Sequence, residues 1–207
     1  MNKWFLLPGM GATAAMYNAL RHKIDFEINF IDWPVYRGEK TYAEVAHRVV
    51  AENNIENGDI IGGSSLGGMV ALEIGQVIQP KACVLLGSAV NISEVQSLLA
   101  MFSPLVTITP IALVQVLAGK QKSLVSTMLS DANAEFIRAM CSYLHLWPSY
   151  SGQMSNIYRL HGKKDHVIPC PPAGVTVIED AGHLLAITHA NEAAAFLQKV
   201  KAHLSAS

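Results

Sequence analysis

Charged residues are scarce in this sequence, and neither sign of charge is concentrated in it. They make up 15% of the 207 residues, whereas an ordinary soluble domain has about 25%. Lys and Arg number 15 against 16 Asp and Glu, which gives a formal net charge of -1. This balance provides no basic surface to neutralise phosphates, so nucleic acid is not an expected partner. The hydrophobic content of 51% also excludes a disordered chain.

Cysteine is rare too, at three residues, which are Cys83, Cys141 and Cys170. They lie far apart and form no C-x-x-C pair, so the sequence offers neither a disulfide framework nor a zinc site. We expect no metal and no cofactor. The first apolar stretch ends at Pro8 and Gly9, short of the roughly 7–15 apolar residues that a signal peptide needs. These features favour a cytoplasmic protein.

One long segment, residues 95–119, carries no charge at all. It is long enough to cross a bilayer, which takes about 20 residues. However, Pro104 and Pro110 would break a spanning helix twice. We therefore interpret the segment as short apolar helical pieces and predict no transmembrane span.

Strand-like apolar runs alternate with helix-like runs in most of the chain. Strands are predicted at residues 4–7, 28–31, 59–61, 82–86, 157–160 and 175–178, and helices at 12–21, 42–50, 69–78 and 191–203. This alternation is typical of a parallel sheet covered on both faces. Helical, proline-broken pieces interrupt the rhythm at about 88–150. The sequence thus predicts one α/β domain over residues 1–207, with a roughly six-stranded, mostly parallel sheet, helices on both faces and a small helical insertion.

A G-x-S-x-G motif, residues 63–67, follows a predicted strand directly and precedes a predicted helix. A nucleophile on such a tight strand-to-helix turn stands clear of the sheet, where a substrate carbonyl can reach it. The turn brings strand and helix so close that the positions two before and two after the nucleophile must be small. Gly63 and Gly67 satisfy this requirement for Ser65, whereas Leu66 violates it for Ser64. Ser65 is therefore the candidate nucleophile.

A serine hydroxyl needs a base, and the base needs a third group that orients it. Asp165 follows the fifth predicted strand and His183 follows the sixth, so both are expected at the same carboxyl edge of the sheet as Ser65. Their chain order of Ser, Asp and His is the order that this type of turn requires. The rival residues for the acid and base roles are His161, His166, Asp180 and His189.

A developing oxyanion needs backbone N–H donors. The residue after the nucleophile supplies one, from Leu66, and the loop after the first strand supplies a second. That loop is Pro8-Gly9-Met10-Gly11, and we expect the N–H of Met10 to be the donor.

Together these motifs make the chain resemble the α/β-hydrolase superfamily, and specifically its small members with a short helical lid. The motifs are PGMG, GSSLGG, HGKKDHVIP and AGHLL, and GSSLGG is similar to the turn of carboxylesterases of the pimeloyl methyl ester type. The usual His-Gly of the oxyanion loop is Pro8-Gly9 here. The resemblance implies a serine hydrolase that cleaves a small-molecule carboxylic ester or thioester through an acyl-enzyme. Residues 88–150 fall where such proteins place the lid, whose apolar side chains would roof an acyl pocket.

Two other functions compete with this interpretation. Residues 9–14, GMGATA, fit the G-x-G-x-x-A fingerprint of dinucleotide-binding oxidoreductases, and Asp32 ends the next strand at a suitable distance to hold a ribose. That interpretation makes no use of Ser65, Asp165 and His183. The second alternative is a lyase or a non-catalytic binding protein with the hydrolase fold. The oligomeric state is not predicted.

Overall fold

A computed structural model describes residues 2–95, 133–152 and 156–206 of the chain. Its centre is a six-stranded sheet in the order β2-β1-β3-β4-β5-β6, and every neighbouring pair of strands is parallel. The predicted parallel sheet is thus confirmed. The strands are β1 Trp4–Leu7, β2 Asn29–Phe30, β3 Ile60–Ser64, β4 Ala82–Leu86, β5 Ile157–Gly162 and β6 Thr176–Ile178.

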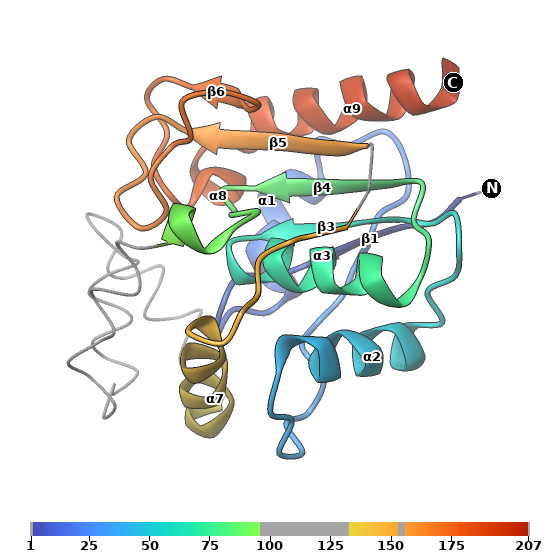
Figure 1. Ribbon diagram of the computed structural model, residues 1–207. Helices are drawn as coiled ribbons and strands as arrows, with labels where there is room; N and C mark the ends of the chain where they lie inside the picture. Colours follow the sequence, from blue (N-terminus) through green and yellow to red (C-terminus); the bar gives the residue numbers. More distant parts are fainter. Residues whose placement is uncertain (1, 96–132, 153–155, 207) are drawn as a thin grey trace.

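Helices cover both faces of this sheet, as predicted (Figure 1). One face carries α1 and α9, and the opposite face carries α2 and α3. Their bounds are α1 Asn18–Arg21, α2 Tyr42–Asn53, α3 Leu66–Val77 and α9 Ala190–Ala206, and the shorter α8 is Leu185–Thr188.

The central strands separate two hydrophobic cores. All four residues of β1 are buried, and successive side chains of a strand point to opposite faces. Phe5 and Leu7 therefore pack in the cluster that contains α2 and α3, whereas Trp4 and Leu6 pack in the cluster that contains α1 and α9. Burial on both faces explains why the strands read as continuous apolar runs in the sequence.

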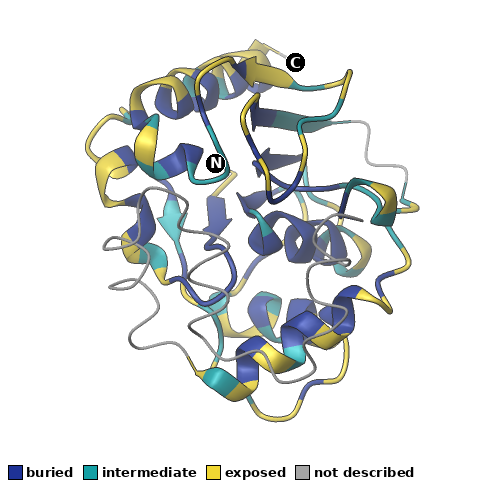
Figure 2. Cartoon of the chain, turned by 90° about the vertical axis from the view of Figure 1, so that its left-hand side faces the viewer, coloured by how far each residue is buried: buried dark blue, intermediate teal, exposed yellow. Residues whose placement is uncertain are grey.

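Parallel strands bring several loops to one edge of the molecule. The loops that follow β1, β3, β5 and β6 all leave the sheet at its carboxyl edge, on the left in Figure 1. Figure 2 looks onto this edge and shows the buried strands enclosed by helices whose outer surfaces are exposed. Ligands of open α/β sheets bind outside this edge.

The insertion predicted at about 88–150 is described at its two ends. A 3-10 helix, Ile92–Val95, and the helix α7, Ala134–Leu144, agree with its predicted helical character. The apolar residues predicted to roof an acyl pocket fall within 101–129, outside the described residues, so the lid stays a prediction. None of the helices formed by the described residues has both the length and the apolar character of a membrane-spanning helix.

The bounds of β1 and β4 match the predicted ranges, and the other elements differ from theirs by one or more residues. Two of these differences have a clear physical cause. The helix predicted at 12–21 is a 3-10 helix, Ala14–Tyr17, followed by the single turn of α1. Thr13 provides no side-chain cap there, and the Met16 N–H bonds the Thr13 carbonyl three residues back, which winds the segment more tightly. In addition, β3 continues past the predicted stop at Gly62 and ends at Ser64. Glycine is required inside the strand at this point, because a Cβ at Gly62 would lie 2.2 Å from the Val84 carbonyl oxygen of β4.

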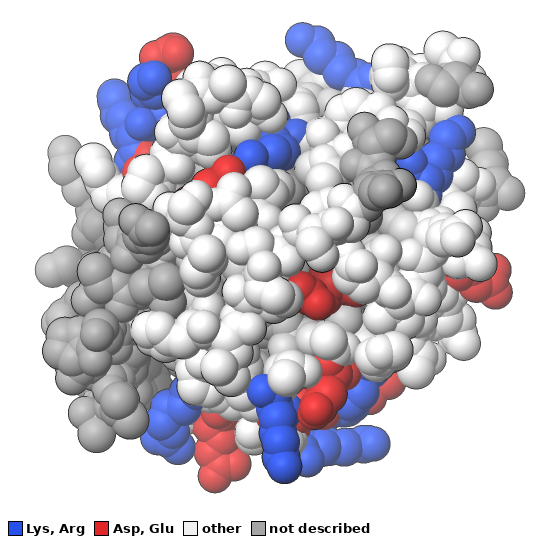
Figure 3. Space-filling view, viewed as in Figure 1, with Lys and Arg blue, Asp and Glu red and all other residues white. Residues whose placement is uncertain are grey.

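The few charged side chains are mixed in sign. The face drawn in Figure 3 is largely uncharged, and its acidic and basic side chains lie mostly near the margins. Arg48 of α2 pairs with both Glu39 and Glu52. The Arg159 guanidinium of β5 lies 2.6 Å from the carboxylate of Glu94.

We expect Leu197→Ala to lower the free energy of unfolding by about 2–5 kcal/mol, because this side chain of α9 is fully buried in the core. Lys199 is exposed two residues further on, and Lys199→Ala, as the matched control, is expected to change the free energy by less than about 0.5 kcal/mol. Urea unfolding followed by circular dichroism measures both variants. Equal losses in the two variants would contradict the buried face assigned to α9.

Candidate active site

Ser65 occupies a strained turn between β3 and α3. Its backbone angles, φ 52° and ψ -122°, lie in a region that side-chain-bearing residues rarely adopt. The backbone is tightly packed on both sides of it. A Cβ at Gly63 would lie 2.5 Å from the carbonyl carbon of Gly67, and a Cβ at Gly67 would lie 2.3 Å from the Pro8 carbonyl oxygen. Both positions therefore require glycine, as the steric argument from the sequence expects.

The preceding serine, Ser64, points elsewhere. Its hydroxyl is buried and lies 2.9 Å from the phenol oxygen of Tyr17, which donates a 2.6 Å hydrogen bond to the Leu7 carbonyl. Burial raises the pKa of Tyr17 well above its ordinary value, so the phenol stays a donor. This contact ties the end of β1 to the end of β3, next to the strained turn.

The structure brings Ser65, His183 and Asp165 together in one hydrogen-bonded chain, called the relay below. The His183 Nε2 lies 2.9 Å from the Ser65 Oγ, and the His183 Nδ1 lies 2.8 Å from the Asp165 Oδ2. His183 follows β6 and Asp165 follows β5, so the shared carboxyl edge of parallel strands is what makes them meet. The imidazole is placed to accept the serine proton while the carboxylate holds its other nitrogen.

Asp165 is buried but held in its ionised form. Burial alone would raise the pKa of this carboxyl group. The charge of His183 and hydrogen bonds from His161, His183 and the Ile168 N–H outweigh burial, and together they hold the pKa well below its usual range. Both carboxylate oxygens are occupied, since Oδ1 also accepts the Val167 and Ile168 N–H groups at 2.9 Å. The acid is therefore fixed in position and charge.

His161, one of the rival residues, contacts the carboxylate of the relay directly. Its fully buried Nε2 lies 2.8 Å from the Ile168 carbonyl oxygen and 3.3 Å from the Asp165 Oδ2. The spacing of four residues between His161 and Asp165 is the only trace of this contact in the sequence. The remaining rivals lie outside the relay, because His189 pairs with Asp180 at 3.4 Å and His166 is exposed.

The two expected oxyanion donors belong to segments that adjoin Ser65. Leu66 begins α3, where a helix leaves its first N–H groups without intrahelical partners and favours negative charge. Met10 lies in the loop after β1, and a Cβ at the neighbouring Gly9 would lie 3.8 Å from the Ser65 Cβ. Among the described residues, neither the Leu66 nor the Met10 N–H has an acceptor. These two amides therefore stay the candidate oxyanion donors.

The dinucleotide interpretation finds no matching geometry at the loop after β1. The Asp32 Oδ1 accepts the Ala14 N–H at 2.6 Å, so the carboxylate that would hold a ribose instead caps the 3-10 helix. The helix that should present its N-terminus to a pyrophosphate is only the single turn of α1 after that 3-10 helix. Within the described ranges, no group of three His, Cys, Asp or Glu side chains is arranged to hold a metal ion.

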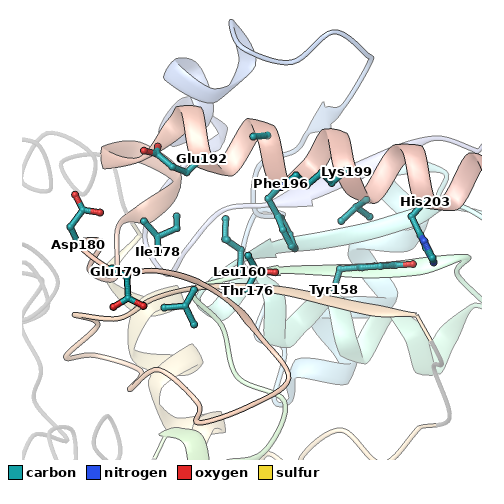
Figure 4. A pocket seen from close by; sticks show the side chains of 13 residues that line it. Tyr158, Leu160, Thr176, Ile178, Glu179, Asp180, Glu192, Phe196, Lys199 and His203 are labelled. Carbon is teal, nitrogen blue, oxygen red and sulfur yellow. The ribbon is translucent and has the colours of Figure 1, made fainter.

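A separate groove of about 640 Å³ lies between α9 and the strands β5 and β6 (Figure 4). Leu160 and Phe196 line it, and Glu179 and Glu192 lie near one end. The side chains of the relay do not line this groove, so it is not the candidate active site.

The sequence matches the model of the Alpha/beta hydrolase family over residues 4–196. The chain therefore belongs to the alpha/beta hydrolase family, which sets its coarse class as a hydrolase acting on small molecules. No curated protein sequence matches the chain significantly.

Solved structures share its fold at low sequence identity. A thermophilic esterase from Thermogutta terrifontis is 15% identical to this chain, and its structure superposes with a TM-score of 0.78. The match includes 99% of this chain and 90% of the esterase chain. The N-acyl homoserine lactonase AidH is 13% identical with a TM-score of 0.71, covering 99% and 90%. An epoxide hydrolase from hot-environment metagenomes is 12% identical with a TM-score of 0.64, covering 96% and 90%. At these identities the likeness shows the fold alone.

The lowered pKa of Asp165 makes a prediction about acid stability. In the unfolded chain an Asp has a pKa of about 3.9. At pH values above this, the ionised Asp165 contributes its full stabilisation to the fold, and this contribution is lost as the pH falls toward the lower pKa that Asp165 has in the folded protein. We therefore expect the advantage of the wild type over Asp165→Asn in unfolding free energy to be larger at about pH 5 than at about pH 3. Urea unfolding of both proteins measures this. An advantage that stays constant or grows in acid contradicts the prediction.

Proposed function

We propose that this protein is a serine hydrolase that cleaves a carboxylic ester or thioester through an acyl-enzyme. The observation that carries the proposal is the relay, in which one imidazole lies within 2.9 Å of the Ser65 hydroxyl and 2.8 Å of a buried carboxylate. The strained turn that presents Ser65 supports the same chemistry, as do the candidate donors Met10 and Leu66 in the adjoining segments.

The relay and the two amides define each step of the proposed reaction. The Ser65 Oγ attacks the carbonyl carbon while His183 Nε2 takes the hydroxyl proton. The N–H groups of Met10 and Leu66 bind the negative oxygen of the tetrahedral intermediate. His183 then gives its proton to the leaving alcohol or thiol, and Asp165 stabilises the imidazolium in between. A water molecule activated by His183 releases the acid and regenerates the Ser65 hydroxyl.

The identity of the nucleophile favours acyl chemistry over epoxide opening. A serine that attacks an epoxide forms an ether with the substrate, and water does not hydrolyse an ether under mild conditions. A serine that attacks an ester forms a new ester, which the same relay hydrolyses. A catalytic cycle through Ser65 is therefore complete for esters and thioesters.

Replacement of Ser65 tests the proposal directly. We expect Ser65→Ala to lower ester hydrolysis by about 10⁴-fold or more and to abolish labelling by a fluorophosphonate probe, because the nucleophile is gone. Ser64→Ala is the matched control, and it retains labelling because its hydroxyl contacts Tyr17 rather than His183. Gel fluorescence after probe treatment and a nitrophenyl ester assay measure both properties. Labelling that survives Ser65→Ala places the nucleophile elsewhere.

The predicted lid leads to a proposal about the acyl group. Residues 88–150 carry the apolar side chains expected to roof an acyl pocket, so we expect kcat/KM to rise along a nitrophenyl ester series from short to long acyl chains. Each buried methylene group contributes about 0.8 kcal/mol to binding. Equal kcat/KM values along the series contradict an apolar acyl pocket without affecting the role of Ser65. The cytoplasmic location stays a prediction.

A further inference from the structure

The peptide unit between Gly9 and Met10 is held by a side chain from another part of the chain. The Gly9 carbonyl oxygen accepts the indole N–H of Trp33 at 3.0 Å and the backbone N–H of Ala12 at 3.1 Å. The Gly9 N–H in turn contacts the Met16 sulfur at 3.2 Å. This short loop, which has no regular secondary structure of its own, therefore has its peptide planes fixed by specific partners.

The orientation of this peptide determines where the Met10 N–H points. In a trans peptide the C=O and N–H groups point in opposite directions, and the described part of the chain contains no cis bond. A carbonyl bound to Trp33 thus directs the Met10 N–H away from the indole. Hydrogen bonds that a peptide carbonyl accepts also polarise its N–H and strengthen it as a donor. The contact with Trp33 therefore acts on both the direction and the strength of the Met10 donor.

Trp33 is itself held by the helix α7. Its ring packs against Phe136 with ring centroids 5.4 Å apart, and Phe136 also contacts Tyr36. A second contact joins the same helix to the loop, since the thiol of Cys141 donates to the Met10 sulfur at 3.4 Å. Burial raises the pKa of Cys141 to about 11, which keeps this thiol protonated. The loop is thus supported by α7 both through Trp33 and directly.

We propose that Trp33 is a positioning residue of the oxyanion hole, whose indole N–H fixes the Gly9–Met10 peptide with the Met10 amide facing the reacting oxygen. This inference rests on the proposed function, because it concerns the same tetrahedral intermediate. Trp33 touches none of the side chains of the relay in the described contacts, so its effect is transmitted through the peptide. Phe136 keeps the indole in place.

Removal of the indole N–H alone tests this role. Trp33→Phe keeps an aromatic ring against Phe136 but leaves the Gly9 carbonyl without its indole donor. One oxyanion donor is worth about 10²–10³ in rate, and we expect a misdirected donor to lower kcat by about tenfold or more with KM within about twofold. Trp4→Phe is the matched control, because Trp4 lies at the start of β1 and packs in the opposite core. It is expected to leave kcat unchanged.

A transition-state analogue separates positioning from general loss of structure. A trifluoromethyl ketone forms a tetrahedral adduct with the serine and places a negative oxygen in the hole. We expect Trp33→Phe to weaken its binding by the same factor by which kcat/KM falls, whereas fluorescence-monitored unfolding shows a folded protein. Phe136→Leu keeps the indole N–H of Trp33 but removes the aromatic ring that packs against it. We expect this variant to lower both ketone affinity and kcat/KM, by a smaller factor than Trp33→Phe.

The outcomes distinguish this inference from the proposed function. Parallel losses of kcat and ketone affinity in Trp33→Phe and Phe136→Leu, absent in Trp4→Phe, support it. A wild-type kcat in both Trp33→Phe and Phe136→Leu overturns the inference about Trp33. Losses of kcat no larger than that of Trp4→Phe overturn it too. In both cases the proposed hydrolysis through Ser65 is unaffected. A wild-type protein that neither hydrolyses esters nor binds the ketone overturns the proposed function and this inference with it.

Discussion

The two hydrogen bonds of one imidazole are the contacts on which the account depends. His183 bonds Ser65, which follows the central strand β3, and Asp165, which follows β5, the strand next to the edge strand β6. These residues are far apart in the sequence, and only the common carboxyl edge of parallel strands brings them together. A sheet with any of these strands reversed would place one member of the relay on the opposite edge.

Around this contact the backbone is packed too tightly for side chains. Gly63 and Gly67 approach neighbouring backbone atoms so closely that a single added carbon would overlap them. The strain at Ser65 is therefore sustained by close packing on both sides. The same packing places the loop after β1 against the turn, where Tyr17 links the ends of β1 and β3. Rigid surroundings of this kind suit a site that must hold charge in a fixed geometry.

Much of the fold follows from local patterns. The bounds of β1 and β4 match the predicted ranges, because a strand buried on both faces is a short apolar run between turns. The glycine spacing also identifies the turn at Ser65 and predicts which serine it exposes. The contact of His161 with Asp165 and that of Trp33 with the Gly9 carbonyl cannot be read from the sequence. The first depends on how the loop after β5 folds back, and the second joins residues from two different loops. The predicted end of β3 at Ile61 was wrong. Glycine usually weakens a strand, but at Gly62 the backbone of β4 lies too close for any other residue.

The most direct test of the account is the chemical fate of Ser65 during turnover. The wild-type protein is mixed with a nitrophenyl ester, quenched within the first turnover and digested, and the peptide containing Ser65 is analysed by mass spectrometry. If Ser65 is the nucleophile, this peptide gains the mass of the acyl group on Ser65, in step with the burst of nitrophenol. Nitrophenol release at the full rate with an unmodified Ser65 peptide, or with the acyl group on another residue, would contradict the account.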